Sequence, residues 1–422
     1  MSPVETAVPI ELSQRVTRLR PSATLAVSAR VKALQNAGVD VIGFGAGEPD
    51  FDTPGNIKRA AIEALEAGKT GYAPVPGEAS VRRVIAKKLS EENGIECSAD
   101  DIVISTGAKQ SIYLALQCLL DPGMGQQVIV PTPAWVSFFP MVELAGGEVV
   151  EVECSVANDF RMTAAQLETA INERTRAIIL NSPSNPCGTM YSGGELAALA
   201  DVLARHENVA IISDEIYEKL VFGDEAHVSI GSLPQVADRT ITINGLSKAY
   251  AMTGWRLGYA CAPAPTPAPA PGHGHGLAKA MAKLQGQMTT SITTFLQPAI
   301  IEALTNSAEE VEGMRRTFAR RAIQMHGLVS AMPGVLCPKP TGAFYVFPDV
   351  SAHFNKTTPQ GRRIVSALSF AEALLEEAKV AVVPGEDFGA IGHRHVRLSF
   401  ACSEYDIEQG CERMRQWLEG LK

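Results

Sequence analysis

The segment 244–260, NGLSKAYAMTGWRLGYA, brings together three side chains that could perform chemistry on a bound aldehyde. It follows an apolar run and contains Ser247, Lys248 and Arg256. A lysine at the end of a buried strand loses solvation, which lowers the pKa of its amine and makes it nucleophilic toward an aldehyde. A neighbouring hydroxyl and guanidinium can bind a phosphate. The segment therefore predicts a site for a phosphorylated aldehyde; the alternative is an ordinary surface lysine after a turn.

A second segment, SDEIYEKL (213–220), places a carboxylate at the end of an apolar run. Asp214 follows VAIIS directly, so its carboxylate is expected at the end of a buried strand, where it needs a cationic or protonated partner. A protonated pyridine nitrogen meets that need and makes the ring an electron sink. Tyr217 could reach a phenolate oxygen of the same ring. The alternative is that Asp214 caps the N-terminus of the next helix.

Two further segments follow apolar runs and contain turn residues. In NSPSNPCG (181–188), two X-Pro steps and a glycine force a rigid turn. Asn185 could donate from this turn to a ring oxygen. The alternative is that Asn185 is an ordinary turn residue. In STGAKQ (105–110), the expected strand passes into a helix at Gly107 and Ala108. Free N–H groups at a helix N-terminus bind anions, and small residues let a phosphate approach.

These segments are expected at one edge of an α/β domain. Apolar runs alternate with helical patterns such as 108–120 and 192–206, which is typical of a mostly parallel sheet flanked by helices. The expected strands are 101–106, 126–131, 146–153, 176–181, 208–214 and 240–245. In such sheets ligands gather at the carboxyl ends of the strands, and the four segments above all follow such ends.

The C-terminal third has a different pattern. A long polar helix is expected over 306–332, followed by a mixed segment and a final helix, which together indicate a smaller α+β domain completed by the N-terminal segment. The stretch 263–276 has Pro at every second position from Pro263 to Pro271 and is expected to be a solvated surface loop. Its His273 and His275 would form a poor metal cage, so no metal site is predicted.

Composition narrows the function classes. The 422 residues include 37 Lys and Arg against 46 Asp and Glu, a formal charge of -9, which argues against nucleic acid or an anionic membrane as the main partner. We see no secretory signal and no apolar stretch approaching the ~18–20 residues that span a bilayer. Eight scattered cysteines without a C-x-x-C pair indicate reduced thiols. A cytoplasmic location is therefore expected.

Together the motifs resemble the class I aminotransferases of fold-type I, which depend on pyridoxal 5'-phosphate. The matching motifs are S-K-x-x-x-M-T-G-W-R-x-G-Y (247–259), N-P-x-G (185–188), S-D-E-I-Y (213–217) and A-G-E-P-D-F-D-T-P (46–54). The subgroup most resembled is bacterial aspartate aminotransferase of the kind that lacks the partner-chain arginine. The resemblance runs from about Leu12 to Leu421. It implies a large domain with a mostly parallel seven-stranded sheet and a smaller α+β domain built from both termini.

The resemblance also implies domain boundaries and cofactor contacts. The expected units are an N-terminal arm with part of the small domain (1–57), the large domain (58–315) and the C-terminal small domain (316–422). Lys248 would bind the cofactor's aldehyde carbon covalently and then act as general acid and base. Asp214 would contact the ring nitrogen, and Tyr217 and Asn185 the phenolate oxygen. Trp135 would stack on the ring; the alternative is that it only fills the core. The phosphate would be bound by Ser247, Arg256, Gly107 and Ala108. Tyr72 would reach the phosphate of the neighbouring subunit, which implies a homodimer with shared active sites.

For the substrate, the resemblance assigns Arg397 to the α-carboxylate, together with the backbone N–H of Gly47; Asn185 and Trp135 also contact the substrate. No arginine occurs between Arg256 and Arg315, where one subgroup carries the residue that binds a side-chain carboxylate. Lys109, beside the phosphate turn, is the best replacement; the alternative is a lysine on a helix surface.

The implied reaction moves the amino group of L-aspartate to 2-oxoglutarate. Prephenate, or a broader range of aromatic amino acids and alanine, is the alternative substrate choice. A β-lyase would keep the cofactor residues but release ammonia. A non-enzymatic sensor would normally carry a basic DNA-binding segment, and the sequence contains none.

Overall fold

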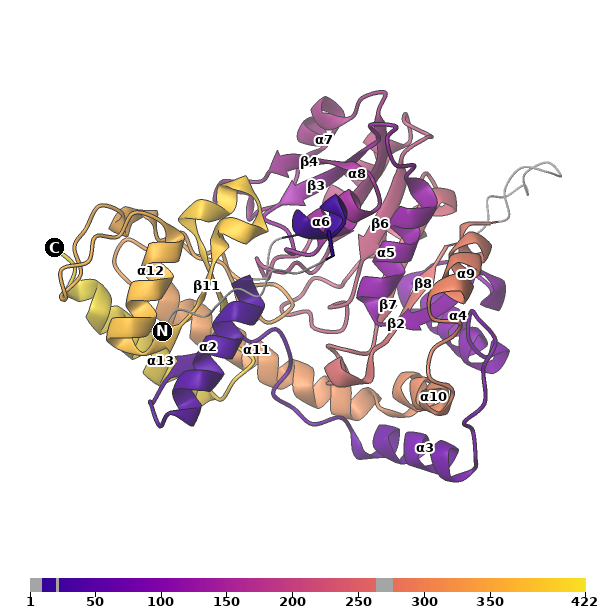
Figure 1. The fold of residues 1–422 in the computed structure, drawn as a ribbon, viewed down its shortest axis with the longest axis horizontal. Helices are drawn as coiled ribbons and strands as arrows, with labels where there is room; N and C mark the ends of the chain where they lie inside the picture. Colours follow the sequence, from indigo (N-terminus) through magenta and orange to yellow (C-terminus); the bar gives the residue numbers. More distant parts are fainter. Residues whose placement is uncertain (1–9, 20–22, 263–275) are drawn as a thin grey trace.

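Strands and helices of the middle of the chain form a central sheet with helices on its faces (Figure 1). The structure is a computed structural model, and it describes residues 10–19, 23–262 and 276–422. Of the segment expected to be a Pro-rich loop, only Gly276 lies within these ranges, as the residue that precedes helix α9. His273 and His275 lie outside the described residues.

The central sheet has seven strands in the order β2-β8-β7-β6-β5-β3-β4. β8 is antiparallel to both neighbours, and the other adjacent strands are parallel. The strands are β2 (Ile102–Thr106), β3 (Gln127–Thr132), β4 (Glu148–Glu153), β5 (Thr175–Asn181), β6 (Ala210–Asp214), β7 (Thr240–Gly245) and β8 (Leu257–Cys261). Asn181 is in register with Asp214, so the turns after β5 and β6 leave the sheet side by side. The mostly parallel seven-stranded sheet confirms the expected fold class.

Helices cover the sheet because its strands are apolar on both faces. Those associated with it are α3 (Gly55–Glu66), α4 (Ala79–Asn93), α5 (Ala108–Leu119), α6 (Phe138–Leu144), α7 (Ala164–Ala170), α8 (Gly193–Leu203), α9 (Leu277–Met288) and α10 (Gln297–Asn306). Local chemistry sets several starts: at α8, Ser192 and Glu195 form a reciprocal capping box that satisfies free backbone N–H groups. The helical patterns at 108–120 and 192–206 correspond to α5 and α8.

All six strands expected from the pattern are present, with ends that shift by at most two residues. The seventh, β8, was missed because it lies inside the motif that carries Lys248 and Arg256. Its five residues are all buried and so show no alternation of apolar and polar side chains. The antiparallel return of β8 places the end of this motif beside β2, where the phosphate turn begins.

A second, smaller unit combines both termini. Its elements are α1 (Gln14–Thr17), α2 (Ala23–Asn36), β1 (Ile42–Gly43), α11 (Ala308–Ser330), β9 (Tyr345–Val346), α12 (Ala367–Ala373), β10 (Val380–Ala381), β11 (Val383–Pro384), β12 (Val396–Ser399) and α13 (Glu404–Glu419). β1 pairs in parallel with β10, and β11, β12 and β9 form an antiparallel sheet. The N-terminal segment therefore completes the small α+β unit, as expected.

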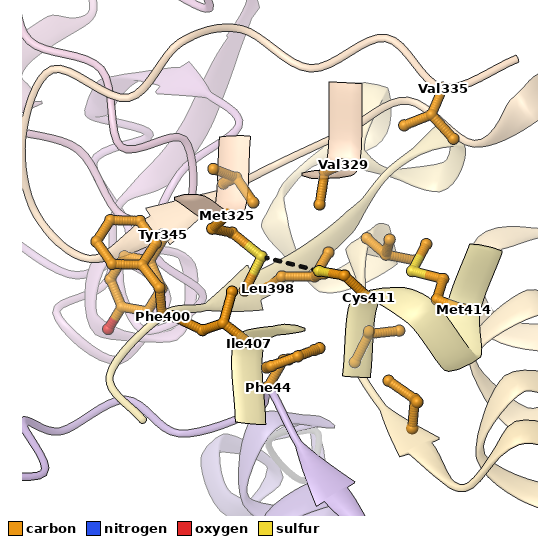
Figure 2. Close-up of a cluster of buried hydrophobic side chains, with 14 of the residues drawn as sticks. Phe44, Met325, Val329, Val335, Tyr345, Leu398, Phe400, Ile407, Cys411 and Met414 are labelled. Carbon is orange, nitrogen blue, oxygen red and sulfur yellow. Dashed lines mark hydrogen bonds between the residues drawn. The ribbon is translucent and has the colours of Figure 1, made fainter. Parts of the chain in front are cut away.

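The core of this unit joins residues that are far apart in the chain (Figure 2). Phe44 from the N-terminal segment lies among side chains of α11, β12 and α13, and it is fully buried. Met325 of α11 and Cys411 of α13 are in contact, with 3.6 Å between their sulfur atoms. Packing of this kind fixes β12 within the small unit, and β12 carries a predicted substrate residue.

The long helix α11 connects the two units (Figure 1). The expected domain limits at 57/58 and 315/316 fall inside α3 and α11, so the chain crosses both of them within continuous helices. Arg321 of α11 forms a bidentate pair with Asp50, with N–O distances of 2.7 and 2.8 Å. The helix is thereby tied to the N-terminal segment.

Within the described ranges, no helix is long and apolar enough to cross a membrane. All eight cysteines fall in these ranges and carry free thiols. The prediction of reduced thiols is therefore confirmed for the chain.

Candidate active site

A cavity of about 860 Å³ lies where the carboxyl ends of the strands face the small unit. The predicted residues that line it are Gly47, Ala108, Lys109, Trp135, Asn185, Asp214, Tyr217, Ser247, Lys248, Arg256 and Arg397. Glu48, Thr253 and Tyr345 line it too and were not predicted. The fold thus brings the four chemical segments and the small-domain arginine into one cavity.

Lys248 follows β7 and extends into the cavity. Its Nζ donates to the carbonyl oxygen of Gly47 at 2.5 Å. Burial, reinforced by the positive charge of Arg397, lowers the pKa of the Lys248 amine to about 8. Roughly a tenth of the amine is therefore neutral at pH 7, far more than for an exposed lysine. The burial of the amine excludes the interpretation of Lys248 as a surface lysine.

Asp214 ends β6 with its carboxylate in the cavity. The pKa of Asp214 is raised to about 7, chiefly by burial and also by the charge of the adjacent Glu215. A hydrogen bond from the Ile216 N–H to Oδ1 (3.3 Å) and the positive charge of Lys248 act in the opposite direction. Residues 216–219 form a turn, so Asp214 caps no helix and the capping alternative is wrong. A carboxyl group held this way is ready to pair with a cationic ring nitrogen.

Asn185 and Tyr217 face the same space from two neighbouring turns. The Asn185 backbone N–H donates to Asn181 Oδ1 at 2.8 Å, which fixes the turn after β5. The Tyr217 hydroxyl is 3.1 Å from that of Tyr345, and burial raises the pKa of Tyr217 well above its usual value. Tyr345 comes from β9 of the small unit. Its sequence context is an apolar strand, which gives no signal of a site.

The phosphate turn has room for an anion and no room for a larger residue. Gly107 has a φ of +81° and precedes α5; a Cβ there would lie 2.4 Å from Arg256 Nη2. A Cβ on Gly258 would lie 2.2 Å from the Ala108 nitrogen. Arg256, with its own φ of +56°, is thus held against the start of the helix. Ser247 is 7% exposed beside it.

These residues fit pyridoxal 5'-phosphate. The set combines a lysine of lowered pKa, a buried carboxyl group, two donors for a ring oxygen and a glycine cradle with an arginine at a helix N-terminus. Each matches one feature of the cofactor: its aldehyde, ring nitrogen, phenolate oxygen and phosphate. The chain's own residues therefore supply a complete binding set for the ring and a cradle for the phosphate.

Arg397 on β12 is 2% exposed, an unusual state for a guanidinium. Nη1 donates to Asn185 Oδ1 at 3.0 Å and Nη2 to the carbonyl oxygen of Gly45 at 3.1 Å. Its guanidinium lies 4.6 Å from the centroid of the Tyr345 ring. None of these partners is a carboxylate, so the buried charge of Arg397 is available to an anionic substrate.

Trp135 and Lys109 lie together at another wall of the cavity. Lys109 Nζ is 4.8 Å from the centroid of the Trp135 ring. Burial and the nearby Arg256 lower the pKa of Lys109. Trp135 lines the cavity and also packs edge-on against Phe138 of the core.

Tyr72 lies outside the cavity. It is 93% exposed and lines a separate hollow of about 350 Å³ with residues 289–295. Within one chain it does not reach the phosphate turn, so the contact predicted for it requires a second subunit.

Known proteins are similar to this chain over nearly its whole length. Residues 39–414 match the family model described as aminotransferase class I and II. The chain is 44% identical to an aspartate/prephenate aminotransferase of Cereibacter sphaeroides and to an aspartate aminotransferase of Geobacillus stearothermophilus, each alignment covering 97% of this chain and 99% of the relative. Among solved structures, an aspartate aminotransferase from Rhizobium meliloti superposes with a TM-score of 0.91 at 38% identity over 98% of this chain and 100% of that chain. An aspartate aminotransferase from Thermus thermophilus with maleate superposes with a TM-score of 0.86 at 41% identity, over 96% of this chain and 99% of that chain.

Proposed function

Because the chain belongs to the class I and II aminotransferases, which use pyridoxal phosphate, we propose that it transfers the amino group of L-aspartate to 2-oxoglutarate. The products are oxaloacetate and L-glutamate. The proposal rests on one observation: the same cavity is lined by Lys248, Asp214, Arg397 and Lys109. This set joins a nucleophile, a carboxyl group for the ring nitrogen and two cationic positions for a dicarboxylate.

The cofactor would be held by Lys248 at its aldehyde, Asp214 at its ring nitrogen, Asn185 and Tyr217 at its phenolate oxygen, Trp135 on its ring face, and Ser247, Arg256 and the N–H groups of Gly107 and Ala108 at its phosphate. When bound, it supplies an aldehyde that accepts the amino group and a ring that takes up electrons as the α-proton leaves.

The chain's own residues perform the remaining steps. Arg397 binds the α-carboxylate through its two parallel N–H groups, aided by the Gly47 N–H, and so orients the α-carbon. Lys248 Nζ, once free, removes the α-proton and returns it at the other end of the transfer. Arg397 lies on the small unit and Lys248 on the large one, so binding of both groups to one molecule draws the units together and excludes water.

Lys109 selects the dicarboxylic substrate in this proposal. Its ammonium lies beside the phosphate turn, within the same cavity as Arg397. One solved relative is described as an aspartate aminotransferase with maleate, itself a dicarboxylate. Prephenate is the second candidate, favoured because a relative of 44% identity is an aspartate/prephenate aminotransferase.

Replacement of Lys109 by Ala is expected to lower kcat/KM for aspartate by roughly 10–100-fold and to leave that for alanine within about threefold, because a charged hydrogen bond contributes about 1.5–3 kcal/mol. Steady-state kinetics with both donors measures this. Lys32→Ala is the matched control, since Lys32 lines the same cavity on α2. Unchanged discrimination in Lys109→Ala, or a loss confined to Lys32→Ala, contradicts the assignment.

The experiment that tests the function uses the protein loaded with pyridoxal phosphate and L-aspartate without any oxo acid. One equivalent of oxaloacetate per active site and no ammonia is the expected result. Ammonia release would instead identify a β-lyase. If aspartate yields no product while glutamate and prephenate react, the prephenate alternative holds.

Cofactor loading is expected to depend on pH through Lys248. The amine must be neutral to attack an aldehyde, and its pKa is about 8 in the unloaded protein. The loading rate should therefore rise about tenfold per pH unit below this pKa and level off above it. Stopped-flow absorbance of apoprotein mixed with pyridoxal phosphate gives the profile, and a rate independent of pH would contradict this role.

We further propose a homodimer in which Tyr72 of each chain reaches the phosphate turn of its partner. Support comes from the 93% exposure of Tyr72 and from its position beside a hollow rather than beside its own cavity. A cytoplasmic location is proposed as well, since eight free thiols in a long chain are typical of a reducing compartment.

A further inference from the structure

Outside the cavity lining, a second group of buried titratable side chains lies beside the turns that follow β5 and β6. His227, Glu215 and Glu218 have potential ligand or proton-binding atoms within 4.8 Å of one another. The side chain of His227 is 9% exposed and that of Glu215 is 1% exposed. None of the three lines the cavity, and no step of the proposed reaction uses them.

On one side, His227 contacts the turn that holds Asn185. Its Nε2 lies 3.2 Å from the carbonyl oxygen of Ser182. A carbonyl oxygen can only accept, so Nε2 carries the proton and donates it. Ser182 starts the turn 182–186, and its own N–H donates to the Asp214 carbonyl oxygen at 3.2 Å. His227 thus contacts the start of the turn from a position outside the cavity lining.

On the other side, the same nitrogen faces the residue after Asp214. Glu215 Oε2 lies 3.8 Å from His227 Nε2 and has no hydrogen-bond partner, whereas Oε1 accepts from the hydroxyls of Ser213 (2.8 Å) and Ser229 (2.7 Å). An unpartnered buried carboxylate oxygen is costly, and a ring N–H nearby reduces that cost. His227 is therefore placed between the two turns.

We propose that His227 is a positioning residue that ties the turn bearing Asn185 to the turn bearing Asp214, and so sets the spacing of the two side chains that contact the cofactor ring. The inference rests on the proposed function only for the identity of that ring. It acts through the Ser182 carbonyl oxygen and the Glu215 carboxylate, because His227 itself does not line the cavity.

The same three side chains do not need a metal ion. Lys88 of α4 hydrogen-bonds to Glu218 Oε1, and Asn93 donates to Glu218 Oε2 at 2.6 Å. The positive charge of Lys88 opposes the burial of Glu218 and holds the pKa of Glu218 at about 2. The other charged group close to Lys88 is Glu92, whose carboxylate lies 3.8 Å away. A cation of the chain therefore already compensates the acidic charge here.

Two amide variants of His227 distinguish the effect of its hydrogen bond to Ser182 from the effect of filling space. Gln places its Nε2 where the histidine Nε2 lies and can still donate to Ser182, whereas Asn is one methylene shorter and cannot reach. The measurement is the Kd of the apoprotein for pyridoxal phosphate, from quenching of tryptophan fluorescence, together with the circular dichroism of the bound cofactor. His353→Asn is the matched control, a histidine 1% exposed in the small unit.

We expect His227→Asn to weaken cofactor binding about tenfold and to alter the cofactor's circular dichroism, while His227→Gln stays within about threefold of the parent. His353→Asn should lower the Tm and leave both cofactor readouts unchanged. Equal affinities in the two His227 variants, or losses that follow Tm in all three variants, overturn the proposal. Failure of aspartate as a donor in the parent protein would overturn the proposed function and leave this result intact.

Discussion

Replacement of Lys248 by alanine is expected to lower kcat with aspartate and 2-oxoglutarate by roughly 10⁴-fold or more. Lys248 is the side chain in the cavity whose amine combines a lowered pKa, about 8, with a position beside the proposed α-carboxylate site. Alanine removes both the covalent anchor of the cofactor and the base that moves the α-proton. Product formation over hours, measured with excess pyridoxal phosphate, gives the residual rate.

Lys219→Ala is the control for this variant. Lys219 lies on the turn after Tyr217, pairs with Glu92 at 2.5 Å and does not line the cavity. Its loss should leave kcat within about twofold, as expected for an exposed ion pair. A Lys248→Ala protein that turns over at a rate close to the parent would show that another group transfers the proton.

Replacement of Arg397 by leucine is expected to lower kcat/KM about 10²–10⁴-fold for every amino donor. The guanidinium is 2% exposed, and its neighbours are carbonyl and amide oxygens rather than carboxylates. Two charged hydrogen bonds to the α-carboxylate would be lost together, and every amino acid carries that carboxylate. The values of kcat/KM for aspartate and for alanine should therefore fall by the same factor. In Lys109→Ala, by contrast, only the value for aspartate is expected to fall.

Arg397→Lys separates charge from geometry at this position. Lysine keeps the charge but cannot offer two parallel N–H groups, so we expect an intermediate loss in kcat/KM. The Kd of the apoprotein for pyridoxal phosphate should change little in either variant, because Arg397 is assigned to the substrate. If Arg397→Leu weakens the cofactor as much as the substrate, the arginine instead supports Asn185, to which it donates at 3.0 Å.

Much of the candidate site could be predicted from local sequence. Asp214 follows four apolar residues and a serine, and Gly107 separates a strand from a helix, so both positions follow from strand length and turn chemistry. The roles of Arg397 and Tyr72, by contrast, came from the family resemblance. Nothing in the few residues around Arg397 distinguishes it from an arginine on an ordinary strand.

Three features escaped the sequence for different physical reasons. The strand β8 is buried on both faces, so its pattern has no period to detect. Tyr345 and His227 act through neighbours 128 and 45 residues away, and no local pattern encodes such pairs.

The sequence by itself determined which side chains end the strands of the sheet and which turns follow them, because apolar periodicity and backbone preference act over a few residues. Only the tertiary structure decided that Arg397 meets Asn185 across 212 residues, that Lys109 lies over Trp135, and that His227 contacts Ser182. Those contacts depend on how helices and sheets pack into one core. Burying a charge or a carbonyl oxygen there costs free energy unless a residue distant in the chain binds it.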